Sequence, residues 1–376
     1  MEVLLSFLIV AALSVTFVDG AGYLQVRPPT LGQCYYEDIN TAHFSYNRTF
    51  CEGPAYWCQI HICWITCGSN ERQSPINIDT RKTQFRLLPM PKFYNLHKRV
   101  PATIRNTGHA PEFNVVQTKS NKDRIILSNV PGRPKDKKYV FAQLHVHFGR
   151  DETQGSEHCI DNIFKPMEAH LVFYDLDYGN LGDARSKKDG LVGLGVMVEV
   201  RGNPQKPTVC KNGRKCKPRF AKRFSDLMEK YYEQVRCFPL EQYRDYIHND
   251  RFGFFRRRNS RSKKYCGGTL SQNYIQNRCK KDPDDNSLKV QVTEGLSPKD
   301  VLPYDTDLFY TYGGSLTTPP CYETVQWIVY KCPITVSSQA FNMLQFVEDS
   351  QKDELIKLGV RRPIQKNRKV TVYSSF

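Results

Sequence analysis

Two runs of the sequence, residues 141–149 and 167–173, constrain what this chain can fold into more than any other part of it. Both are rich in β-branched and aromatic residues and are bounded by Gly, Asp or Pro, which predicts two β-strands. Alternate residues of a strand share a face, so His145 and His147 point the same way from the first strand. His170 lies on the second strand. If the two strands are neighbours in a sheet, three imidazoles converge from a rigid support.

Three neutral imidazoles with an open fourth position are the ligand set of a catalytic zinc site, so we predict Zn²⁺ as the cofactor. Gln143 and Glu168 each lie two residues before one of these histidines, on the same strand face. Each can therefore reach the second ring nitrogen of its neighbour and fix the tautomer. The alternative interpretation of His145 and His147 is a pair of polar residues on a solvated strand face, which the strand pattern alone leaves open.

The start of the chain predicts secretion. Residues 3–18 form an apolar run, and small residues follow it up to Gly20. We interpret residues 1–20 as a signal peptide, although Glu2 stands where a basic residue is usual. An uncleaved anchor helix is the alternative. No later stretch is long and apolar enough to predict a membrane span.

The chain contains 13 cysteines, which predicts an oxidising compartment and several disulfides. Thirteen is an odd number, so at least one thiol is free or joins two chains, and a disulfide-linked oligomer is left open. Asn47-Arg48-Thr49 is a sequon, which predicts glycosylation at Asn47. The predicted location is therefore extracellular.

We expect one domain over residues 21–376, with two unusual segments. The first, 21–72, has too few periodic apolar residues for a core of its own, and we interpret it as an N-terminal arm stapled to the domain by disulfides. A cysteine-rich zinc-binding segment is the alternative. The arm contains Cys34, Cys51, Cys58, Cys63 and Cys67.

The second unusual segment is a basic insertion over residues 201–283. Residues 201–281 contain 22 Lys or Arg and 6 Asp or Glu, so their net charge equals the +16 of the whole chain. This segment also carries five cysteines, and residues 220–234 suit a short amphipathic helix. Its positive field predicts binding of acidic polymers or of carbonate at a mineral face. A solvated, disulfide-tied loop without a partner is the alternative.

The remaining sequence alternates between short strand-like runs and turn residues. Residues 190–200 are almost entirely apolar, which predicts a buried central strand, and residues 325–330 predict another. Residues 338–357 suit a short helix, and residues 369–373 suit a final strand.

Several of these segments, in this order, resemble the α-class carbonic anhydrases. The matching segments are 73–78, 106–109, 143–149, 155–158, 168–172, 190–195 and 314–320. The resemblance covers roughly residues 44–200 and 285–376. It implies an α+β fold, in which a mostly antiparallel twisted central β-sheet carries short peripheral helices. It also implies the reversible hydration of carbon dioxide to bicarbonate and a proton.

A secreted chain with a long insertion after residues 190–200 also resembles the nacrein-type carbonic anhydrases of molluscan shell matrix. This resemblance implies an extracellular, shell-matrix location and a supply of bicarbonate for calcium carbonate. Nacrein insertions contain Gly-Xaa-Asn repeats, which are absent from this chain.

The family resemblance implies a role for each candidate site residue. His145, His147 and His170 match the zinc ligands, with Gln143 and Glu168 as their hydrogen-bond partners. The bound metal lowers the pKa of its water to about 7 in carbonic anhydrases. Thr317 matches the hydroxyl that orients the nucleophile, and Glu157 the buried carboxylate that accepts from Thr317. His109 matches the proton shuttle. The alternatives are an ordinary turn residue for Thr317 and a surface histidine for His109.

The resemblance also implies an apolar wall for carbon dioxide, made of Val172, Leu316 and Trp327, with Thr318 nearby. The family commonly has Val at Gly193, so a wider pocket is expected there, and Phe148 stands at a usual Trp position. Cys67 and Cys321 match the disulfide of secreted family members, which implies a brace for the Thr317 loop.

The sequence also leaves two other functions open. One is a catalytically weak matrix protein that binds acidic polymers or mineral through the basic insertion. Inactive relatives typically lose a zinc histidine, and all three are present here, which favours the enzyme. The other is nucleic-acid binding, which the signal peptide argues against because it directs the chain away from nucleic acid.

Overall fold

The computed structural model describes residues 42–48, 52–118, 120–201, 216–217, 219–236, 289–349 and 359–376. The predicted signal peptide (1–20), Cys34, Cys51 and most of the predicted insertion lie outside these residues. Within the described ranges, no helix combines the length and the apolar character needed to cross a membrane.

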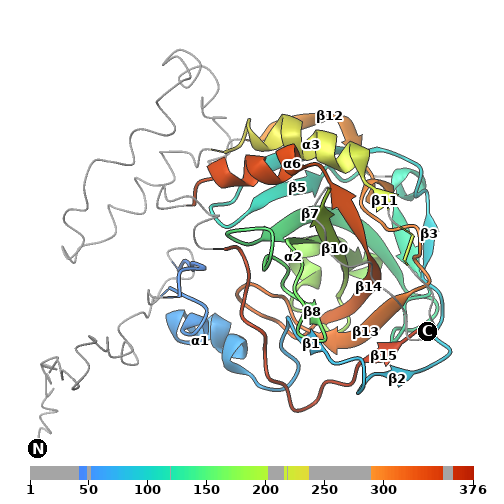
Figure 1. Cartoon of the computed structure of the whole chain (residues 1–376). Coiled ribbons are helices and arrows are strands. Elements are labelled where there is room, and N and C mark those ends of the chain that lie inside the picture. The colour runs from blue at the N-terminus through green and yellow to red at the C-terminus, as the bar shows by residue number, and fades with distance from the viewer. Residues whose placement is uncertain are drawn as a thin grey trace, which may run out of the picture.

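One large twisted sheet forms the body of the molecule (Figure 1). Its strands are β2 (Gln84–Phe85), β3 (Lys92–Tyr94), β4 (Val100–Asn106), β5 (Pro111–Val115), β6 (Ile126–Ser128), β7 (Lys138–Phe148), β9 (Met167–Asp175), β10 (Leu191–Val200), β11 (Arg219–Phe220), β12 (Val290–Leu296), β13 (Phe309–Gly314), β14 (Val325–Val336) and β15 (Tyr373–Ser374). A separate two-stranded sheet pairs β1 (Asn77–Ile78) with β8 (Cys159–Ile160).

The main path through the sheet runs β12-β4-β5-β7-β9-β10-β14-β13-β15-β2. Strand β6 joins β3 to β7, and β11 lies beside β14. Most neighbours are antiparallel, and the parallel pairs are β10–β14, β11–β14 and β15–β2. The predicted α+β fold with a mostly antiparallel sheet is confirmed.

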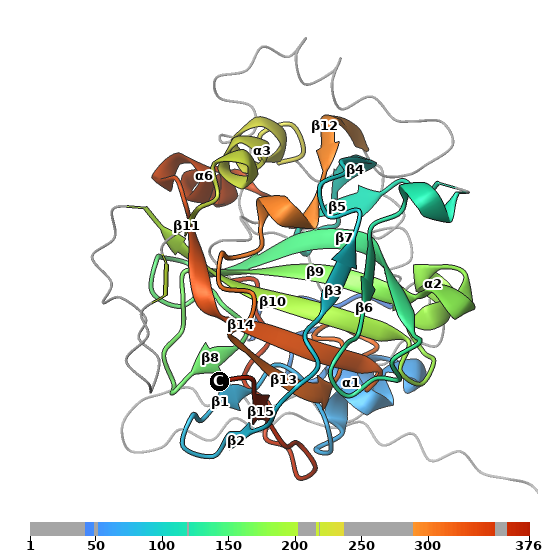
Figure 2. The ribbon, with the colours of Figure 1, turned by 90° about the vertical axis from the view of Figure 1, so that its right-hand side faces the viewer.

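The centre of the sheet is formed by β7, β9, β10 and β14, which lie side by side in Figure 2. Strand β10 is buried over almost its whole length, as its apolar sequence predicts. Because both faces of these strands are covered, side chains on them are held by packing. The candidate site residues of β7 and β9 therefore project from largely buried central strands.

The helices are short and lie around the sheet (Figure 1). They are α1 (Trp57–Ile60), η1 (Ile62–Gly68), η2 (Asn121–Asp123), η3 (Leu176–Tyr178), α2 (Leu181–Ala184), α3 (Lys222–Tyr232), η5 (Pro298–Asp300), α6 (Ser338–Met343) and η6 (Leu344–Phe346). The helix predicted over 338–357 is interrupted at Val347, which is buried and extended, and residues 350–357 of that prediction lie outside the described residues.

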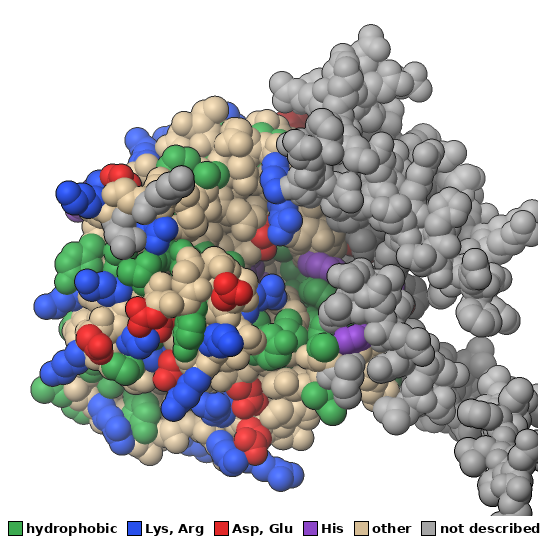
Figure 3. Space-filling view, turned by 180° about the vertical axis from the view of Figure 1, so that it is seen from behind, with side chains coloured by type: hydrophobic (Ala, Val, Ile, Leu, Met, Phe, Trp, Pro, Cys, Tyr) green, Lys and Arg blue, Asp and Glu red, His purple; other side chains and the backbone are tan. Residues whose placement is uncertain are grey.

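The middle of the predicted basic insertion is part of the body. Strand β11 pairs with β14, and the α3 helix follows directly, close to the predicted 220–234. One face of α3 joins the main hydrophobic core through Phe224, Leu227, Met228, Tyr231 and Tyr232. The structure therefore places residues 219–236 in the domain, and only the stretches on either side of them remain candidates for insertion. On the face shown in Figure 3, basic and acidic side chains of the described body are interspersed.

The described part of the N-terminal arm packs against the same core. Trp57 is fully buried, and its indole N–H donates to the carbonyl of Glu52 at 2.9 Å. A disulfide joins Cys67 of the arm to Cys321, as the resemblance implies, and a second joins Cys216 to Cys332. The other described cysteines (Cys58, Cys63 and Cys159) form no disulfide among the described residues. Asn47 is half-buried in the arm.

Candidate metal centre

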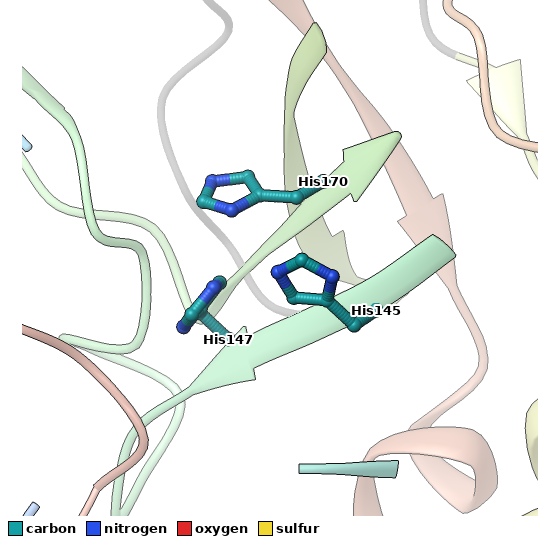
Figure 4. A group of neighbouring side chains, drawn as sticks. All are labelled: His145, His147 and His170. Atoms are coloured by element: carbon teal, nitrogen blue, oxygen red, sulfur yellow. The ribbon is translucent and has the colours of Figure 1, made fainter. Parts of the chain in front are cut away.

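The three predicted histidines converge because β7 and β9 are antiparallel neighbours. In their register His145 lies directly opposite His170, and His147 follows two residues later on the same face. The ring centroids are 5.0 Å apart for His145 and His147, 5.3 Å for His145 and His170, and 4.4 Å for His147 and His170. One nitrogen from each ring lies within 4.8 Å of the others, and Figure 4 shows the three rings facing one another.

The free nitrogens of this group fit a metal ion. His147 uses Nδ1 to contact the carbonyl of Val360 at 2.9 Å, while its Nε2 is buried without a hydrogen bond. His170 uses Nε2 to donate to Glu168 Oε1 at 2.9 Å, which leaves Nδ1 as the nitrogen available for a metal. Burial lowers the pKa of His145 to about 3 and that of His147 well below its ordinary value, with the neighbouring imidazoles adding to the effect. Neutral imidazoles are the form that binds metal.

Glu168 belongs to a hydrogen-bond chain that leads away from His170. Its Oε1 accepts from His170 and, at 2.7 Å, from Nδ1 of His158. Nε2 of His158 is hydrogen-bonded to the Tyr312 hydroxyl at 2.6 Å, and that hydroxyl is hydrogen-bonded to Ser74 Oγ at 2.9 Å. Burial alone would raise the pKa of Glu168, but His158 and His170 hold it well below its usual range. A charged Glu168 fixes the tautomer of His170.

The hydrogen bond predicted between Gln143 and His145 is not formed among the described residues. Gln143 shares the half-buried face of β7 with His145, as the strand pattern predicts. Among the described residues, however, Nδ1 of His145 is buried without a hydrogen-bond partner. A register shift between Phe141 and Gln143 lies just before the predicted partner. The structure therefore shows two of the three histidines oriented by a second contact.

Glu157 and Thr317 lie together next to the histidines. Glu157 is fully buried, its Oε1 accepts from the backbone N–H of Arg362 at 2.7 Å, and its Oε2 lies 3.4 Å from His147 Nε2. Burial raises the pKa of Glu157 to about 7, against the opposing effects of His170, the Arg362 N–H and the Thr317 hydroxyl. The structure thus places the predicted carboxylate beside the three histidines, with the Thr317 hydroxyl near enough to lower its pKa.

Arg362, whose backbone N–H donates to this carboxylate, is itself held in place by its side chain. Its guanidinium is almost fully buried and donates to Gln73 Oε1, to the Ser74 carbonyl and to the Cys67 carbonyl. These three acceptors connect the C-terminal segment to Cys67 of the arm and to Gln73 and Ser74, which directly follow the arm. The sequence offers no local signal for this role, because an arginine next to a proline is usually exposed.

The loop that carries Thr317 is held at both ends. The Leu316 N–H donates to the Tyr322 carbonyl at 3.0 Å, and the Cys321 N–H donates to the Thr318 carbonyl at 2.9 Å. The disulfide to Cys67 anchors the loop to the arm. Thr318 is half-buried in this turn.

His109 lies in a tight turn between β4 and β5. Gly108 has a φ of 77°, which glycine adopts without strain, and Thr107 Oγ1 closes the turn by donating to the Ala110 carbonyl. The imidazole of His109 stacks on Phe44 with 3.8 Å between the ring centroids. Burial, and then the charge of His43, lower its pKa to about 3. Sequence reasoning missed the Phe44 contact because it joins distant segments.

The predicted apolar wall forms one row across three strands. Gly193 of β10 pairs with Val172 of β9 on one side and with Trp327 of β14 on the other. Leu316 packs against the buried hydrophobic cluster that contains Trp327. The wider pocket expected at Gly193 is absent, because a Cβ there would lie 2.8 Å from the Trp327 ring. The Trp327 ring fills that space, and its centroid lies 4.7 Å from the centroid of the His170 ring. Phe148 is buried in the main core.

Comparison with known proteins gives one family and a consistent group of relatives. Residues 52–223 and 254–376 match the family described as eukaryotic-type carbonic anhydrase. The chain is 53% identical over 326 residues to a nacrein-like protein of Mytilus californianus, which covers 85% of this chain and 98% of that protein. It is 32% identical over 413 residues to nacrein of Pinctada fucata, with 89% of each chain covered. It is 37% identical over 194 residues to the N66 matrix protein of Pinctada maxima, covering 49% of this chain and 32% of that protein.

Proposed function

Because this chain belongs to the eukaryotic-type carbonic anhydrase family, we propose that it catalyses the reversible hydration of carbon dioxide at a zinc ion held by His145, His147 and His170. The observation that carries this proposal is the convergence of three imidazoles beside a buried carboxylate and a threonine hydroxyl. Zinc would lower the pKa of a bound water to about 7, the effect established for carbonic anhydrases in general.

The residues around the histidines have complementary tasks in this proposal. In this proposal Thr317 would donate to the neighbouring Glu157, so that its hydroxyl oxygen accepts from the nucleophile and keeps the lone pair of the nucleophile turned toward the substrate. Val172 and Trp327 provide an apolar surface on which carbon dioxide can rest next to His170. We propose His109 as the residue that receives the proton that each turnover releases.

The catalytic proposal is tested by comparing the protein with a His147→Ala variant. We expect one zinc per chain in the parent protein and measurable hydration in a stopped-flow assay. His147→Ala removes one of three ligands while leaving its neighbours in place, so both zinc content and hydration should fall to background. His97→Ala, which removes an exposed histidine bonded to Lys299, is the matched control and should match the parent. Near-native hydration by the His147 variant with zinc bound would contradict the ligand assignment.

We further propose that the enzyme is secreted and supplies bicarbonate for calcium carbonate in an extracellular matrix. The support is the predicted signal peptide, the 13 cysteines and the similarity to nacrein-like proteins and to a protein named as a matrix protein. The basic stretches outside the described body would hold it on acidic matrix polymers. A weak matrix protein without catalysis is the less favoured function, because the metal-binding nitrogens are all in place.

A further inference from the structure

One buried side chain contacts two segments that border the candidate metal centre. Gln73 directly follows the arm and is fully buried. Its amide Nε2 donates to the carbonyl of Cys321 at 3.2 Å and to Glu323 Oε1 at 3.0 Å. Its Oε1 accepts from the guanidinium of Arg362 at 2.9 Å. Both N–H groups and the carbonyl oxygen of the amide are therefore engaged, so the amide can point only one way.

The contact with Arg362 leads to the buried carboxylate. The backbone N–H of Arg362 donates to Glu157 Oε1 at 2.7 Å, and Glu157 Oε2 lies 3.4 Å from Nε2 of His147. A guanidinium that is held in place limits how far the backbone of the same residue can move. Gln73 is thus one residue away from the group that holds Glu157.

The contact with Cys321 leads to the Thr317 loop. The Cys321 N–H donates to the carbonyl of Thr318 at 2.9 Å, which closes the turn directly after Thr317. Gln73 therefore holds the end of this loop with the same amide that binds the guanidinium. Because the disulfide to Cys67 anchors Cys321 as well, loss of the amide contact should loosen the loop without detaching it.

The backbone of Gln73 is fixed independently of its side chain. Its N–H donates to Asn367 Oδ1 at 2.7 Å, and Asn367 Nδ2 donates to the Gln73 carbonyl at 2.7 Å. The amide therefore reaches both segments from a backbone that is itself held on both sides. A substitution of the side chain leaves these two bonds in place, so it tests the amide alone.

We propose that Gln73 is a positioning residue, whose amide holds the Thr317 loop and the Arg362 backbone in a fixed relation to each other. Glu157 accepts from that backbone, so the same amide sets where the carboxylate lies relative to the Thr317 hydroxyl. An amide suits this task because it offers a donor to one segment and an acceptor to the other. The inference rests on the proposed function, since this relation matters for catalysis only if carbon dioxide is hydrated beside it.

The first test needs neither metal nor activity. Hydrogen–deuterium exchange of the full chain, stripped of metal, is followed by mass spectrometry in residues 316–322, residues 360–362 and β10. Gln73→Leu removes both amide contacts, so we expect exchange about tenfold faster in the first two segments, the effect of losing roughly one hydrogen bond, and unchanged exchange in β10. Gln73→Glu keeps the acceptor for the guanidinium but loses the donor, so only residues 316–322 should exchange faster.

The second test is stopped-flow hydration by the zinc-loaded protein. Gln73→Leu should bind zinc as the parent does, because it touches none of the three histidines. Its kcat/KM should fall by roughly 10–100-fold, the usual effect of losing a partner that orients a functional group. Gln84→Leu makes the same change at an exposed glutamine and is the matched control, which should alter neither exchange, zinc content nor hydration.

The outcomes distinguish this inference from the function on which it rests. Parent-like exchange in both segments of Gln73→Leu would overturn the positioning role alone, and so would parent-like hydration despite faster exchange. Equal acceleration in β10 would also overturn it, because that result indicates a general loss of stability. No hydration by the parent protein would overturn the proposed function, and the positioning role with it, even with the expected exchange pattern. If Gln73→Leu does not fold, Gln73→Glu decides the question through residues 316–322.

Discussion

Two glycines of β10 determine where functional side chains of the neighbouring strands can lie. A Cβ on Gly195 would be 2.7 Å from Glu168 Oε1, and a Cβ on Gly193 would be 2.8 Å from the Trp327 ring. Gly195 also pairs with His170 across the β9–β10 ladder. The missing side chains therefore make room for the carboxylate that orients His170 and for the ring that packs beside it.

We expect Gly195→Ala to lower zinc affinity by roughly 10–100-fold, the usual effect of losing a partner that orients a metal ligand. The added methyl group displaces Glu168, so His170 loses its fixed tautomer. Competition with a chelator measures the affinity. Gly313→Ala is the control, because a Cβ there meets nothing within 4 Å. Equal affinity in both variants would show that Glu168 does not orient the ligand.

For single residues, the sequence could predict those site residues whose spacing along the chain is enough to bring them together. His145 and His147 share a face because strands alternate, and the family motifs point to Glu157 and Thr317. The contacts of His158, Tyr312 and Arg362 could not be predicted, because they join residues more than 150 positions apart. The same holds for the Trp327 ring, which fills the space that Gly193 leaves.

Among the elements, α3 shows why local composition misleads. The helix lies in the most basic stretch of the chain, and its exposed residues Lys222, Arg223 and Lys230 add to that charge. Its opposite face packs against α6 and the sheet. The net charge of this segment averages over both faces of the helix, so it indicated a solvated insertion. The 3.6-residue periodicity of the same residues predicted a helix with one buried face. The helix was predictable, but its membership of the core was not.

We expect Phe224→Ala to lower the free energy of unfolding by about 3–5 kcal/mol, as for other large-to-small substitutions in a core. Phe224 is fully buried in the main core cluster. Urea denaturation gives the value, with the exposed neighbour Arg223→Ala as the control that should change stability by less than about 0.5 kcal/mol. A similar small effect for both variants would mean that α3 is peripheral to the fold.

For the whole molecule, the structure shows where residues 237–288 join the body. The carbonyl of Arg236 accepts from the Glu348 N–H and from Asn106 Nδ2, and Val290 pairs with Ile104 on the same strand as Asn106. Both ends of the segment therefore meet the last residues of β4. Closing a long loop between nearby ends costs little more than closing a short one, because the entropic cost rises slowly with length.

We expect replacement of 237–288 by a short Gly/Ser linker to leave hydration and stability close to those of the parent. Binding to immobilised polyaspartate should be lost, and in the parent it should weaken with salt as the Debye length falls from about 10 Å at 0.1 M to about 3 Å at 1 M. Column retention and stopped-flow hydration measure the two effects. Changing Arg256, Arg257 and Arg258 to Gln in the full chain tests charge without shortening it. Unchanged retention after the deletion would place the polymer site elsewhere.

The contact between His147 and Val360 has a consequence for the order of events during synthesis. His147 Nδ1 meets the carbonyl of a residue 213 positions later, and the Glu157 carboxylate meets an N–H 205 positions later. A ribosome that has just released β7 and β9 can bring the three imidazoles together, but not fix the ring of His147 or satisfy Glu157. The three histidines of a nascent chain can thus come together early. The complete site forms only when residues 360–362 have packed against them. If the chain binds zinc as proposed, we therefore expect zinc loading to be a late step that follows completed folding.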